Sequence, residues 1–241
     1  MLPFQLPIEF DPGDFSLETI RESYLDFGLA FENADTILQA VLVTVLLAFF
    51  AEALGVVLGL VLALLKISRF RILSFPAQLY IDVFRGTPLL VQIIFIYFAT
   101  PLIGLRFESL FFAGLTALTL NSAAYVAEIF RSGIQSIDRG QMEAGRASGL
   151  SYGQTMRYIV VPQAFRRVIP PLTNEFVVII KDTSIVSVIG LEELLRAARV
   201  LQSATANATP LVVAALIYLA ICLPLIYLAN GLERRLNRRT A

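Results

Sequence analysis

Long apolar runs constrain this chain more than any other feature of its sequence. A helix that crosses a bilayer needs roughly 20 predominantly apolar residues, and the region between residues 35 and 232 offers several such stretches. We predict membrane spans at about residues 35–65, 75–105, 109–131, 168–191 and 210–232. The sequence therefore indicates an all-α integral membrane protein with about five transmembrane helices.

Composition agrees with this class and excludes others. Hydrophobic residues make up 57% of the 241 residues, and the mean hydropathy is +0.74. Lys and Arg number 19, as do Asp and Glu, so the chain lacks the positive excess that nucleic-acid binding requires. Histidine is absent, which removes the usual zinc ligand and proton relay. We expect no metal site and no catalytic residue.

The distribution of Lys and Arg predicts how the chain is oriented. Cytoplasmic loops collect these residues, and thirteen of the nineteen fall within residues 66–71, 131–167 and 233–241. Residues 1–33 are then extracytoplasmic, 34–232 form the membrane domain, and 233–241 form a basic cytoplasmic tail. This is an N-out, C-in arrangement. Residues 18–31 resemble a short amphipathic outer helix to which we assign no role.

Small and polar residues recur on single faces of two spans. Gly55, Gly59 and Ala63 are four residues apart in the first span, which favours close packing with another helix, and Glu52 on the same stripe predicts a buried polar contact. In the third span, Asn121, Tyr125 and Glu128 share a face with Gly114. Such a face lines a water-filled path or joins helices by hydrogen bonds, and the sequence leaves both alternatives open.

The fourth span carries charge where charge is costly. Lys181 lies fourteen residues, or roughly 21 Å of helix, beyond Arg167, so Lys181 and Asp182 are expected near the middle of the membrane. Together with Thr183 and Ser184 they could complement a zwitterion. They could equally pair with polar groups of other helices and hold the span in register.

The second span is predicted to bend. Gly86 and Pro88 interrupt it, and Asp82 and Arg85 form a potential charged pair one turn apart on its cytoplasmic side. Asp82, Arg85 and Pro88 are candidates for a gate. The alternative is an interfacial anchor in which Arg85 extends to lipid headgroups.

Residues 138–162 are too polar to cross a membrane and too well specified for a linker. Asp138 and Ser151 are each followed three residues later by a glutamine, the pattern of a capping box. Gly149 suits a helix C-terminus, and Pro162 is predicted to end the second helix. The segment therefore reads as two short, separately capped helices that dock a partner, or as a pair lying on the membrane surface.

This segment resembles the EAA loop of ABC-importer permeases. That pattern is Glu-Ala-Ala, three residues, Gly, nine residues and Ile-x-Leu-Pro, and here it reads Glu143, Ala144, Gly145, then Gly149, then 159–162 ending in Pro162. Gly for Ala at position 145 and Val for Leu at 161 are departures. The phrases "FRGTPLLVQ", "LNSAAYVAEIFR", "VVPQAFRRVIPPLTNEF" and "KDTSIVSVIG" further resemble the polar amino-acid branch of that superfamily.

The resemblance implies a permease subunit of the bacterial cytoplasmic membrane. A separate ATP-binding subunit would bind ATP and Mg and receive the coupling positions Glu143, Ala144, Gly145, Gly149 and Pro162. An extracytoplasmic binding protein would deliver a polar amino acid, and a second permease, identical or related, would complete the pair. The chain has no G-x-x-x-x-G-K-[ST] phosphate loop, so we expect no cofactor in it and hydrolysis elsewhere.

Two other functions remain open from the residues alone. An ion-gradient-driven carrier or channel would use Asp182 and Glu128 as relays. A membrane sensor that transports nothing would use residues 138–162 to dock a signalling partner.

Overall fold

The computed structural model describes residues 21 and 23–237, and the described part of the chain is helical, with no strand. The elements follow in chain order: α2 (Phe27–Glu32), α3 (Ala34–Ile67), α4 (Arg71–Gly86), α5 (Leu89–Ala99), η2 (Thr100–Ile103), α6 (Leu110–Gln135), α7 (Arg139–Ala147), α8 (Tyr152–Thr155), a π turn (Met156–Val160), α9 (Val161–Asp182), η4 (Thr183–Ile189), α10 (Leu194–Thr205) and α11 (Thr209–Asn237).

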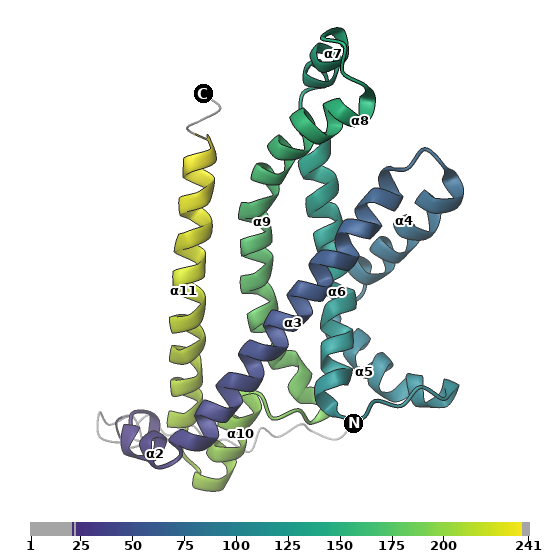
Figure 1. Ribbon diagram of the computed structural model, residues 1–241. Helices are drawn as coiled ribbons and strands as arrows, with labels where there is room; N and C mark the ends of the chain where they lie inside the picture. The colour runs from purple at the N-terminus through teal and green to yellow at the C-terminus, as the bar shows by residue number, and fades with distance from the viewer. Residues whose placement is uncertain (1–20, 22, 238–241) are drawn as a thin grey trace, which may run out of the picture.

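The long helices are suited to a membrane. By length and composition, α3, α6 and α11 could each cross one, and α4 with the α5–η2 segment (Leu89–Ile103) qualifies as a bent pair. The less apolar α9 packs between α6 and α11 (Figure 1). The predicted all-α class with several apolar spans is therefore confirmed.

Close packing of α3 against α6 forms the centre of the molecule. Gly55, Gly59 and Ala63 are all buried in this contact. A Cβ added to Gly59 would lie 2.6 Å from Cγ1 of Val126, so only a residue without a side chain fits there. The predicted small-residue stripe is thus confirmed, and α3 crosses the other helices obliquely (Figure 1).

The predicted bend lies where Gly86 and Pro88 interrupt the second span. Here α4 ends at Gly86 and Pro88 precedes the first residue of α5, and the α5–η2 segment is bent by 109° relative to α4. Proline lacks an N–H and restricts the residue before it to extended backbone, and Thr87 is accordingly extended. The chain therefore turns sharply within a single apolar region.

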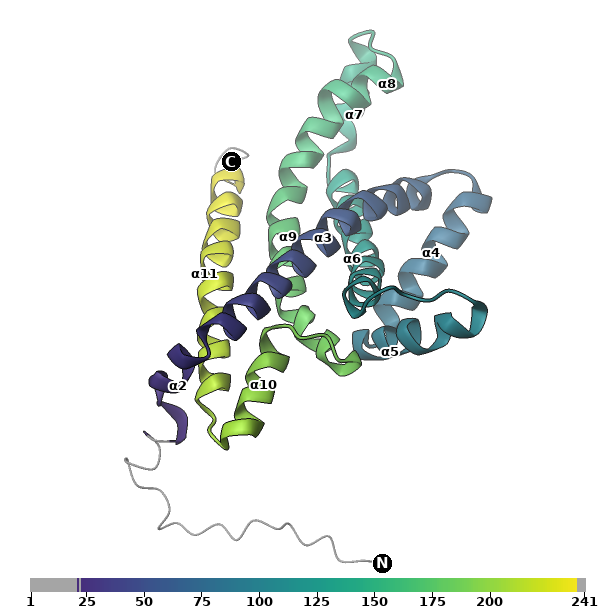
Figure 2. The same cartoon turned by 60° about the horizontal axis from the view of Figure 1, so that its bottom comes forward.

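The two ends of the molecule carry different short helices. The short helices α7 and α8 project at one end, together with the C-terminal end of α11 (Figures 1 and 2); we call this the loop end. At the opposite end, the far end, α10 connects η4 to α11. Most of the predicted N-terminal segment 1–33, and residues 238–241 of the predicted tail, lie outside the described residues. The described part of that segment includes α2, and Asp26 N–H donates to Thr209 Oγ1 at 3.0 Å.

Candidate functional site

The projecting pair α7–α8 is held in shape by its own caps. The side chain of Asp138 accepts a hydrogen bond from Gly140 N–H at 2.6 Å. At the second helix, Ser151 and Gln154 form a complete capping box, with reciprocal distances of 2.8 and 3.2 Å. Gly149 joins the helices with φ +86°, a left-handed conformation that glycine adopts at little cost. The prediction of two separately capped helices is confirmed.

One detail of the first cap differs from the prediction. Gln141 does not complete a capping box, because its side-chain oxygen instead accepts a hydrogen bond from Gln163 at 3.1 Å. This contact ties α7 to the first turn of α9 and strengthens the link between the projecting pair and the long helices.

Gly145 has a packing role that the sequence did not reveal. It is the buried residue of α7, and a Cβ at this position would collide with the side chain of Thr155 on α8. Thr155 is itself fully buried. Glu143, Ala144 and Gly149 are by contrast exposed. The pair therefore packs through Gly145 and presents the other three residues outward.

The prediction that Pro162 ends the second helix is wrong. The chain stays helical from Tyr152 to Asp182, passing through the π turn Met156–Val160, and Pro162 lies in the first turn of α9. A π turn widens the helix locally, which relieves the clash between a proline ring and the carbonyl four residues earlier. As a result α8 and α9 form one continuous rod (Figure 1).

The same rod is fastened to the loop end of α6. A small apolar cluster of Ile137, Val160 and Ala164 joins the segments, and the guanidinium of Arg167 donates to the carbonyl oxygen of Ser136. Displacement of the projecting pair would therefore reach both α6 and α9.

A polar cavity of about 630 Å³ lies between α6, α9 and the end of α4. Its charged and aromatic lining consists of Arg85, Tyr125, Glu128, Arg131, Arg167 and Glu175. Two sequence candidates for a polar path, Tyr125 and Glu128, are thus placed together. The sequence predicted no role for Glu175 or Arg131 in this path.

Glu128 binds three cations from three helices. Its carboxylate pairs with Lys66 at the end of α3, with Arg131 on α6 at 2.9 Å, and with Arg85 on α4 at 3.8 Å. The guanidinium of Arg85 also lies 5.5 Å from the centre of the Tyr125 ring, within cation–π range. Arg85 is the most solvent-exposed of the three cations, since 43% of its side chain is exposed.

The predicted gate residues separate. Asp82 does not pair with Arg85; it accepts a hydrogen bond from Gln78 at 2.6 Å on the exposed face of α4. The reason is geometric, because Arg85 is turned toward α6, where Glu128 and Tyr125 hold it. Arg85 therefore belongs to the cavity, and Pro88 to the bend.

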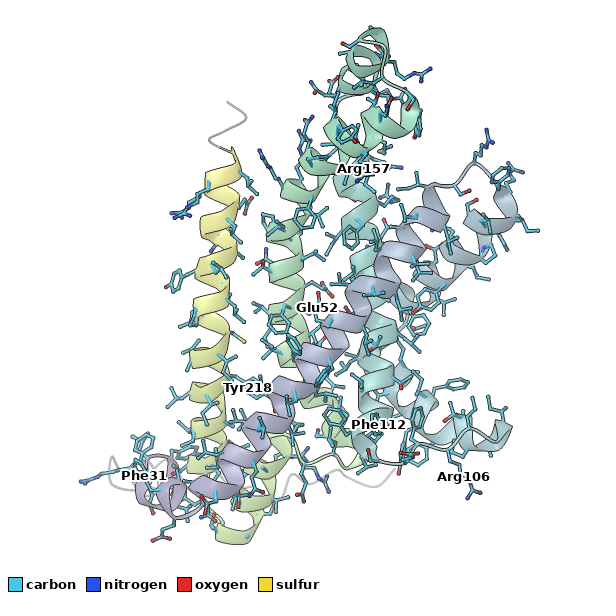
Figure 3. The ribbon with its side chains drawn as sticks, viewed as in Figure 1. Phe31, Glu52, Arg106, Phe112, Arg157 and Tyr218 are labelled. Atoms are coloured by element: carbon cyan, nitrogen blue, oxygen red, sulfur yellow. The ribbon has the colours of Figure 1, made fainter. Side chains whose placement is uncertain are left out.

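Asn121 is buried away from the cavity lining. Its amide nitrogen donates to Oε1 of Gln92 at 2.9 Å, and Gln92 was not singled out from the sequence. Similarly, Glu52 is buried midway along α3 (Figure 3) and accepts a hydrogen bond from Ser122 at 2.8 Å, which confirms the predicted polar contact.

The residues 181–184 do not reach the polar cavity. Lys181 and Ser184 line a second, mainly apolar cavity of about 700 Å³ between α9 and α11, and Asp182 is half-buried beside them. Thr183 is fully buried and donates to the carbonyl of Ile180 at 2.7 Å. Within residues 23–237, no ion pair joins Lys181 to Asp182.

A further buried carboxylate ties the far end together. Glu193 is fully buried and accepts hydrogen bonds from the backbone N–H groups of Leu195 and Arg196, at 2.8 and 2.7 Å, at the start of α10. Tyr218 on α11 donates to it at 2.9 Å, and the next residue, Leu194, donates its N–H to Thr44 of α3. Sequence reasoning missed this cluster, because its members lie up to 174 positions apart (Thr44 and Tyr218).

Comparison with known proteins finds a matching family, similar sequences and a similar structure. The model of a family described as the inner-membrane component of binding-protein-dependent transport systems matches residues 55–238. The arginine transport system permease protein ArtQ of Bacillus subtilis (strain 168) is 42% identical over 215 residues, covering 88% of this chain and 98% of that protein. A putative glutamine transport system permease protein, GlnP, of Rickettsia bellii is 39% identical, covering 83% and 92%. A crystal structure of an amino acid ABC transporter with histidines matches at a TM-score of 0.82 and 41% identity, covering 87% of this chain and 98% of that one.

Proposed function

The chain belongs to the family of inner-membrane components of binding-protein-dependent transport systems, and from this premise we propose that it is the permease subunit of an ATP-driven importer of polar amino acids. The observation that carries the proposal is a continuous mechanical connection. An exposed, capped helix pair continues without a break into α9, and residues 136–138 connect it to α6; these two helices line a polar cavity.

The projecting pair is the proposed docking element for an ATP-binding subunit. Glu143, Ala144 and Gly149 would contact that subunit, which binds ATP and Mg and performs the hydrolysis. Gly145 and Pro162 would act indirectly, Gly145 by allowing α7 to pack on α8 and Pro162 by lying in the rod. Closure of the ATP-binding subunits would then tilt α6 and α9 and open the cavity alternately to each side.

The polar cavity is the proposed site of the amino acid. Its volume falls within the ~300–1,000 Å³ typical of small-molecule sites, and it places opposite charges on different helices. Arg85, with its exposed guanidinium, would receive the substrate carboxylate, and Glu175 would receive the ammonium group. Tyr125 and Glu128 would complete the lining. The names of the relatives support this substrate class, since they include arginine and glutamine transport.

The remaining partners follow from the family and the predicted orientation. The loop end would face the cytoplasm, and an extracytoplasmic binding protein would deliver substrate at the far end. A second permease, identical or related, would pack beside this one. Lys181, Asp182, Thr183 and Ser184 would then serve a part of the path completed by that second subunit, since Lys181 is exposed to an apolar cavity here.

Association with the ATP-binding subunit tests the docking claim. The permease would be co-expressed with its ATP-binding subunit and purified through a tag on the permease. The wild type is expected to retain the ATP-binding subunit, whereas Glu143→Lys and Gly149→Trp lose it. Glu108→Lys, an exposed position outside the projecting pair, is the matched control and should retain it. Equal retention by all four proteins would contradict the proposal.

A further inference from the structure

The bend between α4 and α5 exposes backbone groups that a membrane helix normally satisfies internally. The last carbonyl groups of a helix have no intrahelical partner, and an unsatisfied group in hydrocarbon is costly. At this bend the side-chain amide of Gln92 supplies the partner. Its nitrogen contacts the carbonyl oxygens of Phe84 and Thr87 at 2.8 and 3.1 Å, and the Thr87 hydroxyl at 2.9 Å.

Asn121 fixes the orientation of Gln92. The Asn121 amide nitrogen donates to Oε1 of Gln92 at 2.9 Å, and both side chains are more than 90% buried. A hydrogen-bonded chain therefore runs from α6 through α5 to the end of α4. We call Asn121, Gln92 and Thr87 the bend clamp. Tyr80 adds a second link from α4, since its hydroxyl donates to the carbonyl of Leu120 at 2.7 Å.

The clamp determines where Arg85 lies. Arg85 falls between Phe84 and Gly86, so its backbone is part of the bend that Gln92 holds. Its guanidinium extends to Tyr125 and Glu128, which lie one and two helical turns beyond Asn121 on α6. The helix that anchors the clamp therefore also provides the surface on which Arg85 rests.

We propose that Gln92 and Asn121 are positioning residues, which hold the α4–α5 bend so that Arg85 presents its guanidinium to the substrate carboxylate in the polar cavity. This inference rests on the proposed function and deepens it. Neither residue contacts the amino acid; each acts through Arg85. Asn121 is thereby removed from the direct lining of the path and given an indirect role in it.

A double-mutant cycle on uptake separates positioning from general stabilisation. Proteoliposomes containing the complete complex would take up radiolabelled L-arginine and L-glutamine, and KM and the maximal rate would be measured. Gln92→Met is expected to raise KM roughly tenfold, because a charge-assisted hydrogen bond to the substrate is misplaced. In the Arg85→Ala background, the same Gln92→Met change should leave KM within about twofold of the Arg85→Ala value. If Gln92 acts through Arg85, the effects of the two substitutions are not additive.

Two further variants distinguish an effect on the clamp from an effect of misfolding. Thr87→Val removes a hydroxyl that accepts from Gln92 and donates to the carbonyl oxygen of Val83. It should raise KM by less than the roughly tenfold expected for Gln92→Met, because the bonds of Gln92 to the two carbonyl oxygens remain. Gln78→Met changes the other amide of this helix pair, which bonds Asp82 on the exposed face, and should leave KM unchanged.

The outcomes are distinct. An equal rise in KM for Gln92→Met with and without Arg85, or no rise in either, would overturn the positioning role while leaving the proposed function intact. Absence of ATP-driven uptake by the wild-type complex would overturn the proposed function and this inference with it.

Discussion

Glu128 is the common acidic partner of three cationic side chains. Within residues 23–237, it takes part in every ion pair shorter than 4.0 Å, with Lys66, Arg85 and Arg131. The side chains of Glu128 and Lys66 are only 16% and 15% exposed, so solvent screens this cluster less than a surface ion pair. One carboxylate thus connects the C-terminal parts of α3, α4 and α6.

Removal of this charge should destabilise the protein. Glu128→Gln removes the carboxylate with which Lys66, Arg85 and Arg131 all pair. We expect a loss of about 2 kcal/mol, or a fall in Tm of about 4–8 °C, measured by thermal unfolding of the detergent-solubilised permease. Glu108→Gln, which removes an exposed carboxylate, is the control, and an equal shift in both variants would refute the role of the cluster.

Gly145 lies at a position where the EAA pattern has alanine, and its packing against Thr155 explains the difference. Gly145→Ala should gain about 1 kcal/mol of helix propensity and lose about 1–3 kcal/mol by overpacking, so we expect a looser pair. Gly145→Ala with Thr155→Ala removes both Thr155 atoms that the added Cβ would meet, Cγ2 and Oγ1, and should restore close packing of α7 on α8. Limited proteolysis within residues 138–162 measures the difference. Faster cleavage of the double variant than of the single one would contradict this explanation.

At the scale of elements, the contact between α3 and α6 depends on small residues. A Cβ at Gly59 would lie 2.9 Å from the backbone oxygen of Ala123 as well as 2.6 Å from Val126, and backbone cannot move aside as a side chain can. Gly59→Ala should therefore cost about 1–3 kcal/mol of stability. Gly231→Ala on α11 meets no atom within 4 Å and should be neutral or stabilising by up to about 1 kcal/mol. Thermal unfolding of both variants provides the comparison, and a stable Gly59→Ala would contradict the packing argument.

At the far end, Glu193 connects α10 and α11 by hydrogen bonds. Tyr218→Phe removes the hydroxyl that donates to this fully buried carboxylate, and we expect a loss of about 1.5–3 kcal/mol, the range for hydrogen bonds to charged groups. Tyr227→Phe changes the same residue type on the same helix at an exposed position and should have little effect. Chemical or thermal unfolding distinguishes them, and equal stabilities would exclude a structural role for the Tyr218–Glu193 bond.

The features that could be predicted from the sequence are the local and periodic ones. The Gly55–Gly59–Ala63 stripe, the Ser151 capping box and the bend at Gly86 and Pro88 depend on residues a few positions apart. The bonds that define the site span longer separations: 29 positions for Gln92 and Asn121, and 62 for Lys66 and Glu128. Pattern alone does not pair such residues. Pro162 does not end its helix because a π turn, which has no simple sequence signature, accommodates it.

At the scale of the whole molecule, α3 connects the two ends. Its Lys66 joins the Glu128 cluster at the loop end, and its Thr44 bonds Leu194 beside Glu193 toward the far end. The continuous α8–α9 rod, which begins at the projecting pair, is a second long element that runs toward the opposite end (Figure 1). The proposed coupling between the two ends depends on these two elements.

The most direct test of the account is uptake driven by ATP alone. Proteoliposomes containing the complete complex would be given ATP on the side of the ATP-binding subunit, radiolabelled L-arginine or L-glutamine with the binding protein on the other, and ionophores to dissipate ion gradients. We predict accumulation that persists with the ionophores and disappears with Glu143→Lys. Uptake that requires an ion gradient and proceeds without the ATP-binding subunit would contradict the account.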